Sequence, residues 1–124
     1  MFTTSPATGW DCVHFVESWD STSSEEYRIS ILPGEQVTNG DSLVRLLANA
    51  FDFPDYFGCN LDAAEDCLRD LEWIGATGYV LVVTESARLW QNSPSAAGSL
   101  VSLWLSAAEE WSKSSTPFHL IFVK

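Results

Sequence analysis

Carboxylates are concentrated in one stretch of this sequence, residues 52–72. Arg69 is the single base among them. The seven acids of the stretch are Asp52, Asp55, Asp62, Glu65, Asp66, Asp70 and Glu72. Carboxylates at this density can hold a metal ion, transfer protons in hydrolysis, or attract a positively charged partner. They can also form a solvated face with no specific role, so the residue types alone leave four alternatives open.

The spacing within residues 61–71 predicts an α-helix with two distinct faces. Leu61, Ala64, Leu68 and Leu71 share one face, with Cys67 beside them, whereas Asp62, Glu65, Asp66, Arg69 and Asp70 share the other. Like charges at i and i+4 destabilise a helix by roughly a few tenths of a kcal/mol per pair. Asp62 recovers part of this cost because the helix N-terminus is partly positive. The remaining cost indicates a role for the acidic face outside the fold.

Metal binding and catalysis are the weaker alternatives. The sequence has no calcium-loop motif, and ligands on one straight helical face fan outward instead of converging. Hydrolysis by paired carboxylates needs a second acid on another element, and only Glu109 and Glu110 are available. No nucleophile elbow, phosphate-binding loop or Cys–His pair at a recognisable spacing is present. We therefore expect no enzymatic activity, no metal and no cofactor.

The composition of the chain narrows the class of partner. With 124 residues and 46 % hydrophobic content, the chain predicts one packed domain. Because the net charge is −11 and because lysine and arginine drive contacts with phosphate, we expect the protein not to bind nucleic acid directly. The same charge disfavours an anionic membrane surface and favours a basic protein partner.

Cysteine usage and the N-terminal residues predict a cytoplasmic protein. Cys12, Cys59 and Cys67 form no C-x-x-C pair, and His14 and His119 lie far from any paired cysteine. Neither a zinc site nor a disulfide framework is predicted. The first residues have no basic or apolar signal region, and no apolar run has the length of a membrane span.

Elements of both types surround the acidic helix. Alternation and apolar runs predict strands at 11–16, 27–32, 78–86 and 116–124, and helical spacing predicts helices within 38–53, 61–71 and 95–111. A short helical turn and a loop ending near Pro94 complete the order. The fold class is therefore α/β, with a small three-stranded parallel sheet packed with about four helices. Residues 11–16 can add an edge strand, as a hairpin with 27–32.

The segment FPDYFGCNLDAAEDCLRDL, residues 53–71, resembles the central motif of the barstar family, intracellular inhibitors of the bacterial ribonuclease barnase. The matching residues are Pro54, Asp55, Tyr56, Phe57, Gly58, Asn60, Leu61, Asp62, Asp66, Cys67 and Leu68. The rest of residues 27–124 resembles the family in order, whereas residues 1–26 lie outside it as an N-terminal extension with at most one added strand. The resemblance implies a barstar-like domain at 27–124 that plugs a nuclease active site.

The resemblance also implies a set of partner-binding residues. Asp66 matches the aspartate that enters the enzyme's phosphate pocket, and Asp62 matches an acidic contact at the head of the helix. Tyr56 matches an aromatic contact, and Gly58 and Asn60 match the binding turn. The full set expected to bind the partner is Tyr56, Gly58, Asn60, Leu61, Asp62, Glu65, Asp66, Asp70, Leu71 and Ser106.

Four positions depart from the family pattern. Cys59 stands where the family has a glutamate before the turn asparagine. Glu65 and Leu71 stand where the family's reference inhibitor has tryptophans, and Ser106 stands where it has a glutamate on the last helix. Compared with the family's reference inhibitor, this sequence keeps an acidic binding surface but loses two aromatic side chains. We therefore expect the cognate enzyme to differ from barnase. The expected function is a one-to-one inhibitor, or immunity protein, of a basic secreted ribonuclease. The alternatives are an immunity or regulatory module against a non-ribonuclease toxin, and an enzyme that uses the acidic helix.

Overall fold

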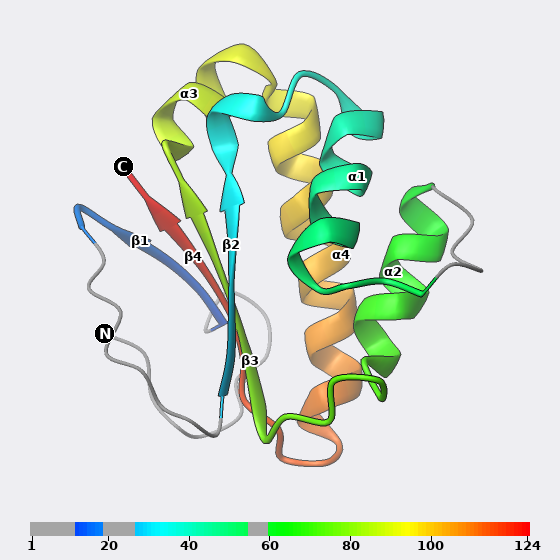
Figure 1. Ribbon diagram of the computed structural model, residues 1–124. Helices are drawn as coiled ribbons and strands as arrows, with labels where there is room; N and C mark the ends of the chain where they lie inside the picture. The colour runs from blue at the N-terminus through cyan, green and yellow to red at the C-terminus, as the bar shows by residue number, and fades with distance from the viewer. Residues whose placement is uncertain (1–11, 19–26, 55–59) are drawn as a thin grey trace.

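The protein consists of a parallel β-sheet with helices packed on one face (Figure 1). The structure is a computed structural model that describes residues 12–18, 27–54 and 60–124. The strands are β1 (Val13–Val16), β2 (Tyr27–Pro33), β3 (Gly78–Thr84) and β4 (Phe118–Val123). The helices are α1 (Gly40–Ala50), α2 (Leu61–Asp70), α3 (Ser86–Asn92) and α4 (Pro94–Ser112), with a short 3₁₀ helix η2 (Gly34–Gln36). The described strands lie in the order β1-β4-β3-β2, and each neighbouring pair is parallel.

The predicted α/β class and parallel sheet are confirmed, with one added strand. Residues 13–16 do form an edge strand, but the predicted hairpin with residues 27–32 is wrong. β1 instead pairs in parallel with β4, at the edge of the sheet opposite β2. Side-chain contacts favour this edge: the rings of Phe15 and Phe122 stack with centroids 5.1 Å apart.

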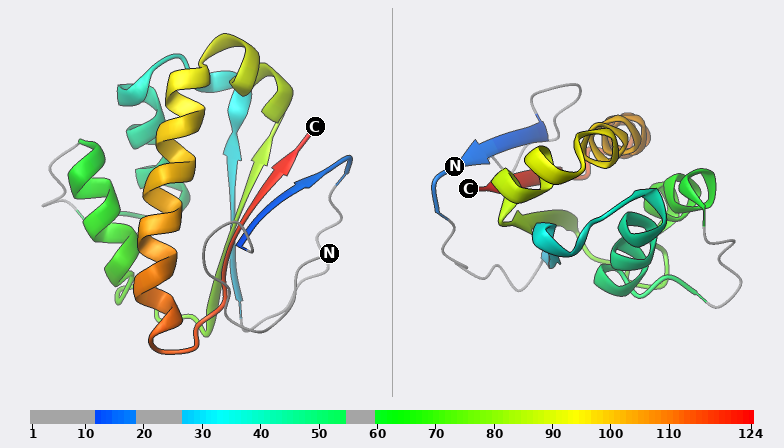
Figure 2. Two further views of the ribbon diagram at one scale, coloured as in Figure 1. Left: turned by 180° about the vertical axis from the view of Figure 1, so that it is seen from behind. Right: turned by 90° about the horizontal axis from the view of Figure 1, so that it is seen from above.

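The main core lies between the sheet and α4. Leu81, Val83 and Leu120 point from β3 and β4 toward the helices and are fully buried. Trp104 of α4 stacks on Phe118 of β4 with ring centroids 4.0 Å apart. Seen from above, the helices gather on one side of the strands (Figure 2). α2 packs mainly against α4, so it lies on the outside of the helical layer.

Two helix starts illustrate local sequence control. Asn39 caps α1 as its residue type predicts, because its side-chain oxygen accepts a hydrogen bond from the Ser42 amide at 2.8 Å. Pro94 was expected to end a loop, but it occupies the first turn of α4. The ring suits that position because the first turn of a helix needs no amide donor. Among the described residues, no helix combines the length and hydropathy that a membrane crossing requires.

A histidine pair links β1 to β4. Nε2 of His14 and Nδ1 of His119 lie 3.0 Å apart, so one imidazole donates a hydrogen bond and the other accepts it. His119 is buried, and burial lowers the pKa of His14 below its ordinary value of 6.5. The pair therefore stabilises the fold with at least one neutral imidazole.

Acidification should weaken the fold through this pair. A group whose pKa is lowered by folding gives its full stabilisation above the unfolded-state pKa and loses it as pH falls. We expect the urea midpoint of unfolding to decrease between pH 7 and pH 5, since burial disfavours the protonated form of His14 in the folded state. In His14→Gln, which cannot titrate, the decrease should be smaller. Equal decreases in the two proteins would show that the pair does not control this pH dependence.

Candidate functional site

α2 is held at both ends by local hydrogen bonds. At its start, Oδ1 of Asn60 accepts a hydrogen bond from the Ala63 amide at 2.8 Å, which satisfies one of the free donors of the first turn. At its end, Leu71 adopts a left-handed conformation with φ of 48°, and its amide donates to the Cys67 carbonyl at 3.0 Å. Glycine usually takes this position, so the complete burial of the Leu71 side chain offsets the backbone cost.

The inner face of α2 is fixed against α4. Ala64 and Leu68 are fully buried there. The indole Nε1 of Trp111 donates to the Leu68 carbonyl oxygen at 2.7 Å, so a side chain of α4 bonds directly to the backbone of α2. These contacts fix the position of α2 relative to the core and determine which of its side chains point outward.

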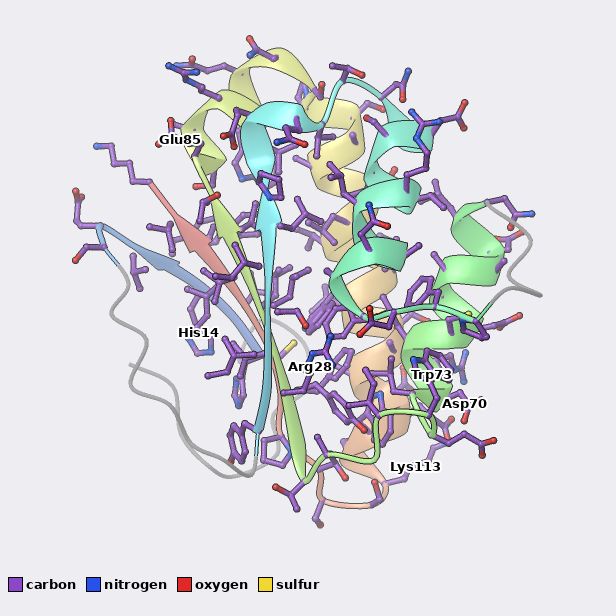
Figure 3. All side chains as sticks on the ribbon, viewed as in Figure 1. His14, Arg28, Asp70, Trp73, Glu85 and Lys113 are labelled. Atoms are coloured by element: carbon purple, nitrogen blue, oxygen red, sulfur yellow. The ribbon has the colours of Figure 1, made fainter. Side chains whose placement is uncertain are left out.

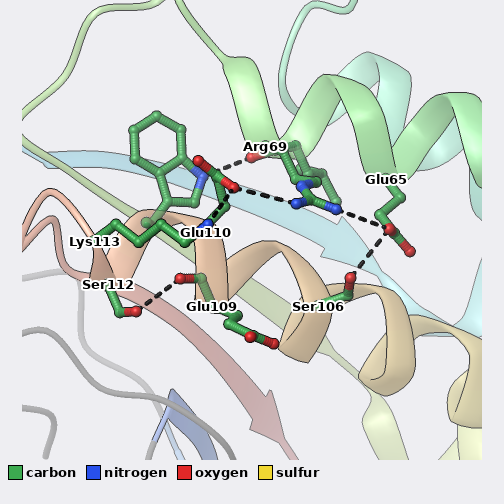
Figure 4. A network of polar contacts seen from close by, with 9 residues as sticks. Glu65, Arg69, Ser106, Glu109, Glu110, Ser112 and Lys113 are labelled. Atoms are coloured by element: carbon green, nitrogen blue, oxygen red, sulfur yellow. Dashed lines mark hydrogen bonds and ion pairs between the residues drawn. The ribbon is translucent and has the colours of Figure 1, made fainter.

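We call the line of contact between α2 and α4 the seam. Polar side chains from the two sides of the seam also bond to one another along its outer edge (Figure 4). We call Glu65, Arg69, Ser106, Glu110 and Lys113 the Arg69 network. The Ser106 hydroxyl donates to Glu65 Oε2 at 3.0 Å, and Arg69 Nη1 lies 3.5 Å from the same oxygen. Arg69 Nη2 lies 3.2 Å from Glu110 Oε1, which Lys113 Nζ approaches at 3.4 Å. The guanidinium therefore bridges the two helices.

Hydrogen bonds and charges within the Arg69 network shift the pKa values of Arg69 and Glu110. The hydrogen bond to Glu110 raises the pKa of Arg69 above its ordinary value. The hydrogen bond from Arg69, followed by the one from Lys113, lowers the pKa of Glu110. Both groups are solvent-exposed at the seam, so the network orients side chains more than it stabilises the fold.

Three further bonds anchor the end of α1 and the residues that follow it. Arg28 of β2 donates to the carbonyl of Ala50 at 3.0 Å and forms an ion pair with Asp52 at 2.9 Å. Trp73, which follows α2, donates from Nε1 to the carbonyl of Phe51 at 2.9 Å (Figure 3). The end of α1 is thus tied to the sheet on one side and to the chain after α2 on the other.

Within residues 12–18, 27–54 and 60–124, three carboxylates on the outer face of α2 have no ion-pair partner. Asp62, Asp66 and Asp70, which we call the aspartate stripe, are exposed and form no ion pair with any cation in the described part of the chain. They recur every fourth residue, so they line up over roughly 12 Å of the helix axis. This surface can accept hydrogen bonds from several cationic groups at once.

The partner residues predicted from the sequence divide into three groups where the structure describes them. Asn60, Leu61 and the aspartate stripe lie together at the start and on the outer side of α2, with Leu61 half-buried. Glu65 and Ser106 also meet, but they bond to each other. Leu71 is fully buried, which leaves its side chain out of reach of a partner. Tyr56 and Gly58 lie outside the described residues.

Sequence reasoning missed the bonds that join α2 to α4. The i,i+4 spacing of Glu65 and Arg69 could have indicated an ion pair. The bonds from Arg69 to Glu110 and from Trp111 to Leu68 join residues about forty positions apart, and no local pattern signals them. Cys67 is packed as predicted, and burial raises the pKa of its thiol, with Asp66 and Asp70 adding to the effect. A nucleophilic role for Cys67 is disfavoured, because the thiolate is suppressed.

Comparison with known families finds a match over most of the chain. The family described as Barstar (barnase inhibitor) matches residues 27–123. The chain belongs to the barstar family. The matched residues include α2, α4 and the whole seam between them, whereas β1 precedes the match. No curated protein matches the chain. In the described ranges of this barstar-family chain, no three His, Cys, Asp or Glu side chains gather closely enough to hold a metal ion.

The cap at Asn60 is expected to support α2 measurably. Replacing an asparagine N-cap with alanine costs about 1 kcal/mol, so Asn60→Ala should lower the free energy of unfolding by about that amount. Asn60→Asp is the matched control because its carboxylate also accepts the Ala63 hydrogen bond. Urea unfolding of the two variants measures the difference. Equal midpoints for the alanine and aspartate variants would contradict the capping role.

Proposed function

We propose that this barstar-family protein is a one-to-one inhibitor of a basic ribonuclease, acting as an immunity or antitoxin protein in the cytoplasm. It binds through α2 and the turn before it, covers the active site of the enzyme and performs no chemistry. Membership of the barnase-inhibitor family supports the class of partner. Cys67 is a buried free thiol, as suits a reducing compartment.

The observation that carries the proposal is the state of Asp66. Its carboxylate lies at the centre of the aspartate stripe, exposed and without a cation partner among the described residues. The helix beneath it is fixed by the Asn60 cap and the Trp111 bond. A ribonuclease pocket holds phosphate with cationic side chains, and a carboxylate oxygen can accept the same charge-assisted hydrogen bonds.

The neighbouring residues take supporting roles in this proposal. Asp62 and Asp70 meet cationic residues on either side of the pocket, and Asn60, Tyr56 and Gly58 belong to the turn that contacts the enzyme. Glu65 and Ser106 support α2 at the seam and do not bind the partner directly, because their polar atoms bond to each other. The buried Leu71 supports the end of α2 and makes no side-chain contact with the partner.

Asp66→Ala is expected to abolish most of the inhibition. Loss of a central interface carboxylate should weaken binding by at least about 2 kcal/mol, roughly 30-fold in Kd. Calorimetric titration and RNA-cleavage assays against barnase and a panel of small basic microbial ribonucleases measure the effect. Glu72→Ala is the charge-matched control, since Glu72 is also exposed but lies outside the stripe.

Two outcomes would contradict the proposal. If Asp66→Ala inhibits as well as the unmodified protein, Asp66 is not the central binding residue. If the unmodified protein inhibits no ribonuclease of the panel but captures a toxin of another activity, the fold stands and the partner class changes.

Association with the enzyme should slow as salt is added. A chain of net charge −11 attracts a basic partner over long range, and salt screens that attraction. Stopped-flow measurement should show the association rate constant falling between 20 mM and 500 mM NaCl, with a smaller change in the dissociation rate constant. An association rate constant independent of salt would argue against the acidic face as the first contact.

A further inference from the structure

Arg69 can reach Asp66 but pairs with other carboxylates. Residues three apart on a helix are surface neighbours, so the Arg69 guanidinium could pair with Asp66 and neutralise it. Instead its two terminal nitrogens approach Glu65 Oε2 at 3.5 Å and Glu110 Oε1 at 3.2 Å. Asp66 is left without a described cation partner, although the base on α2 is within one turn of it.

The two glutamates are themselves fixed on the α4 side. Ser106 donates to Glu65 Oε2 at 3.0 Å, and Lys113 approaches Glu110 Oε1 at 3.4 Å (Figure 4). The planar fork of a guanidinium can engage two carboxylates at once, whereas Asp66 alone offers one. The competition for Arg69 is thus decided by α4, which contributes Ser106 and Glu110, and by Lys113, the residue that follows α4.

Resting on the proposed function, we propose that Glu65 and Glu110 are positioning residues. They hold the Arg69 guanidinium against α4 and thereby keep the Asp66 carboxylate unpaired for a basic partner. In this arrangement the carboxylates at the seam, Glu65 and Glu110, have a different role from those of the aspartate stripe. Glu65 and Glu110 bind a cation of the protein itself, and Asp66 stays available for a cation of the partner.

The first test examines the position of Arg69 without any partner. In Glu65→Gln/Glu110→Gln the amides can still accept from Ser106 and Lys113, but the charge that attracts the guanidinium is gone. A crystal structure of this variant should place Arg69 beside the Asp66 carboxylate. A guanidinium that stays on the α4 side overturns the proposal. In Arg69→Gln, an NMR titration should show the Glu110 pKa rising toward its ordinary value, which a purely packing role of Arg69 would not produce.

The second test measures the consequence for binding, with barnase as the probe. Glu65→Gln/Glu110→Gln should weaken binding by at least about twofold more than Glu72→Gln/Glu109→Gln, an equal change of charge outside the network. Adding Arg69→Gln to the first variant should restore the affinity, because the competing cation is removed. Adding Arg45→Gln, the same charge change on α1, should not. Measurements at 500 mM NaCl reduce long-range charge effects.

The outcomes separate this proposal from the proposed function. If Arg69→Gln and Arg45→Gln restore affinity equally, only net charge matters and the positioning role is overturned. If barnase does not bind the unmodified protein, the proposed function fails for that enzyme, and a hexa-arginine peptide replaces it as the probe. NMR shifts of the Asp66 amide on adding the peptide should then be smaller in Glu65→Gln/Glu110→Gln and recover with Arg69→Gln. Equal shifts in all three proteins overturn the positioning role.

Discussion

The aspartates of α2 repel one another, so the helix that carries them has to be held in place from its inner side. Burial of Ala64 and Leu68 supplies that attachment, and the hydrogen bond from Trp111 to the Leu68 carbonyl strengthens it. Because this hydrogen bond goes to the helix backbone, it occupies none of the outer side chains of α2. The acidic surface can therefore keep its charge because α4, and not the surface itself, stabilises the helix.

This division suits a protein that binds another protein. An interface loses affinity when its side chains and backbone have to be ordered on binding, so a helix already fixed at both ends saves that cost. The repulsion within the aspartate stripe works in the same direction. It is a small cost in the free protein, where water screens exposed charges, and it is relieved when a basic partner supplies the opposite charge.

Sequence patterns predicted the parts of this arrangement that depend on local periodicity. The bounds and the two faces of α2, the parallel sheet and the packed Cys67 follow from residue spacing. The partner of β1 does not, because the contact of His14 with His119 joins residues 105 positions apart. Leu71 was assigned to the interface from its matched position, whereas the left-handed turn at that residue directs it into the core. The Arg69 network was missed for the same reason as the β1 pairing, since Ser106 and Glu110 come from α4, far along the chain from Arg69.

Neighbouring carboxylates on α2 therefore differ in their contacts according to their distance from α4. Glu65 lies on the seam, where Ser106 and Arg69 bind it. Asp66 is the next residue and is rotated by about 100° around the helix axis, which takes it out of reach of the α4 side chains. Composition treats the two as equal negative charges, and both contribute to the long-range field that attracts a basic partner. Short-range contact distinguishes them, because only a carboxylate without an internal cation can exchange water for a cation of the partner.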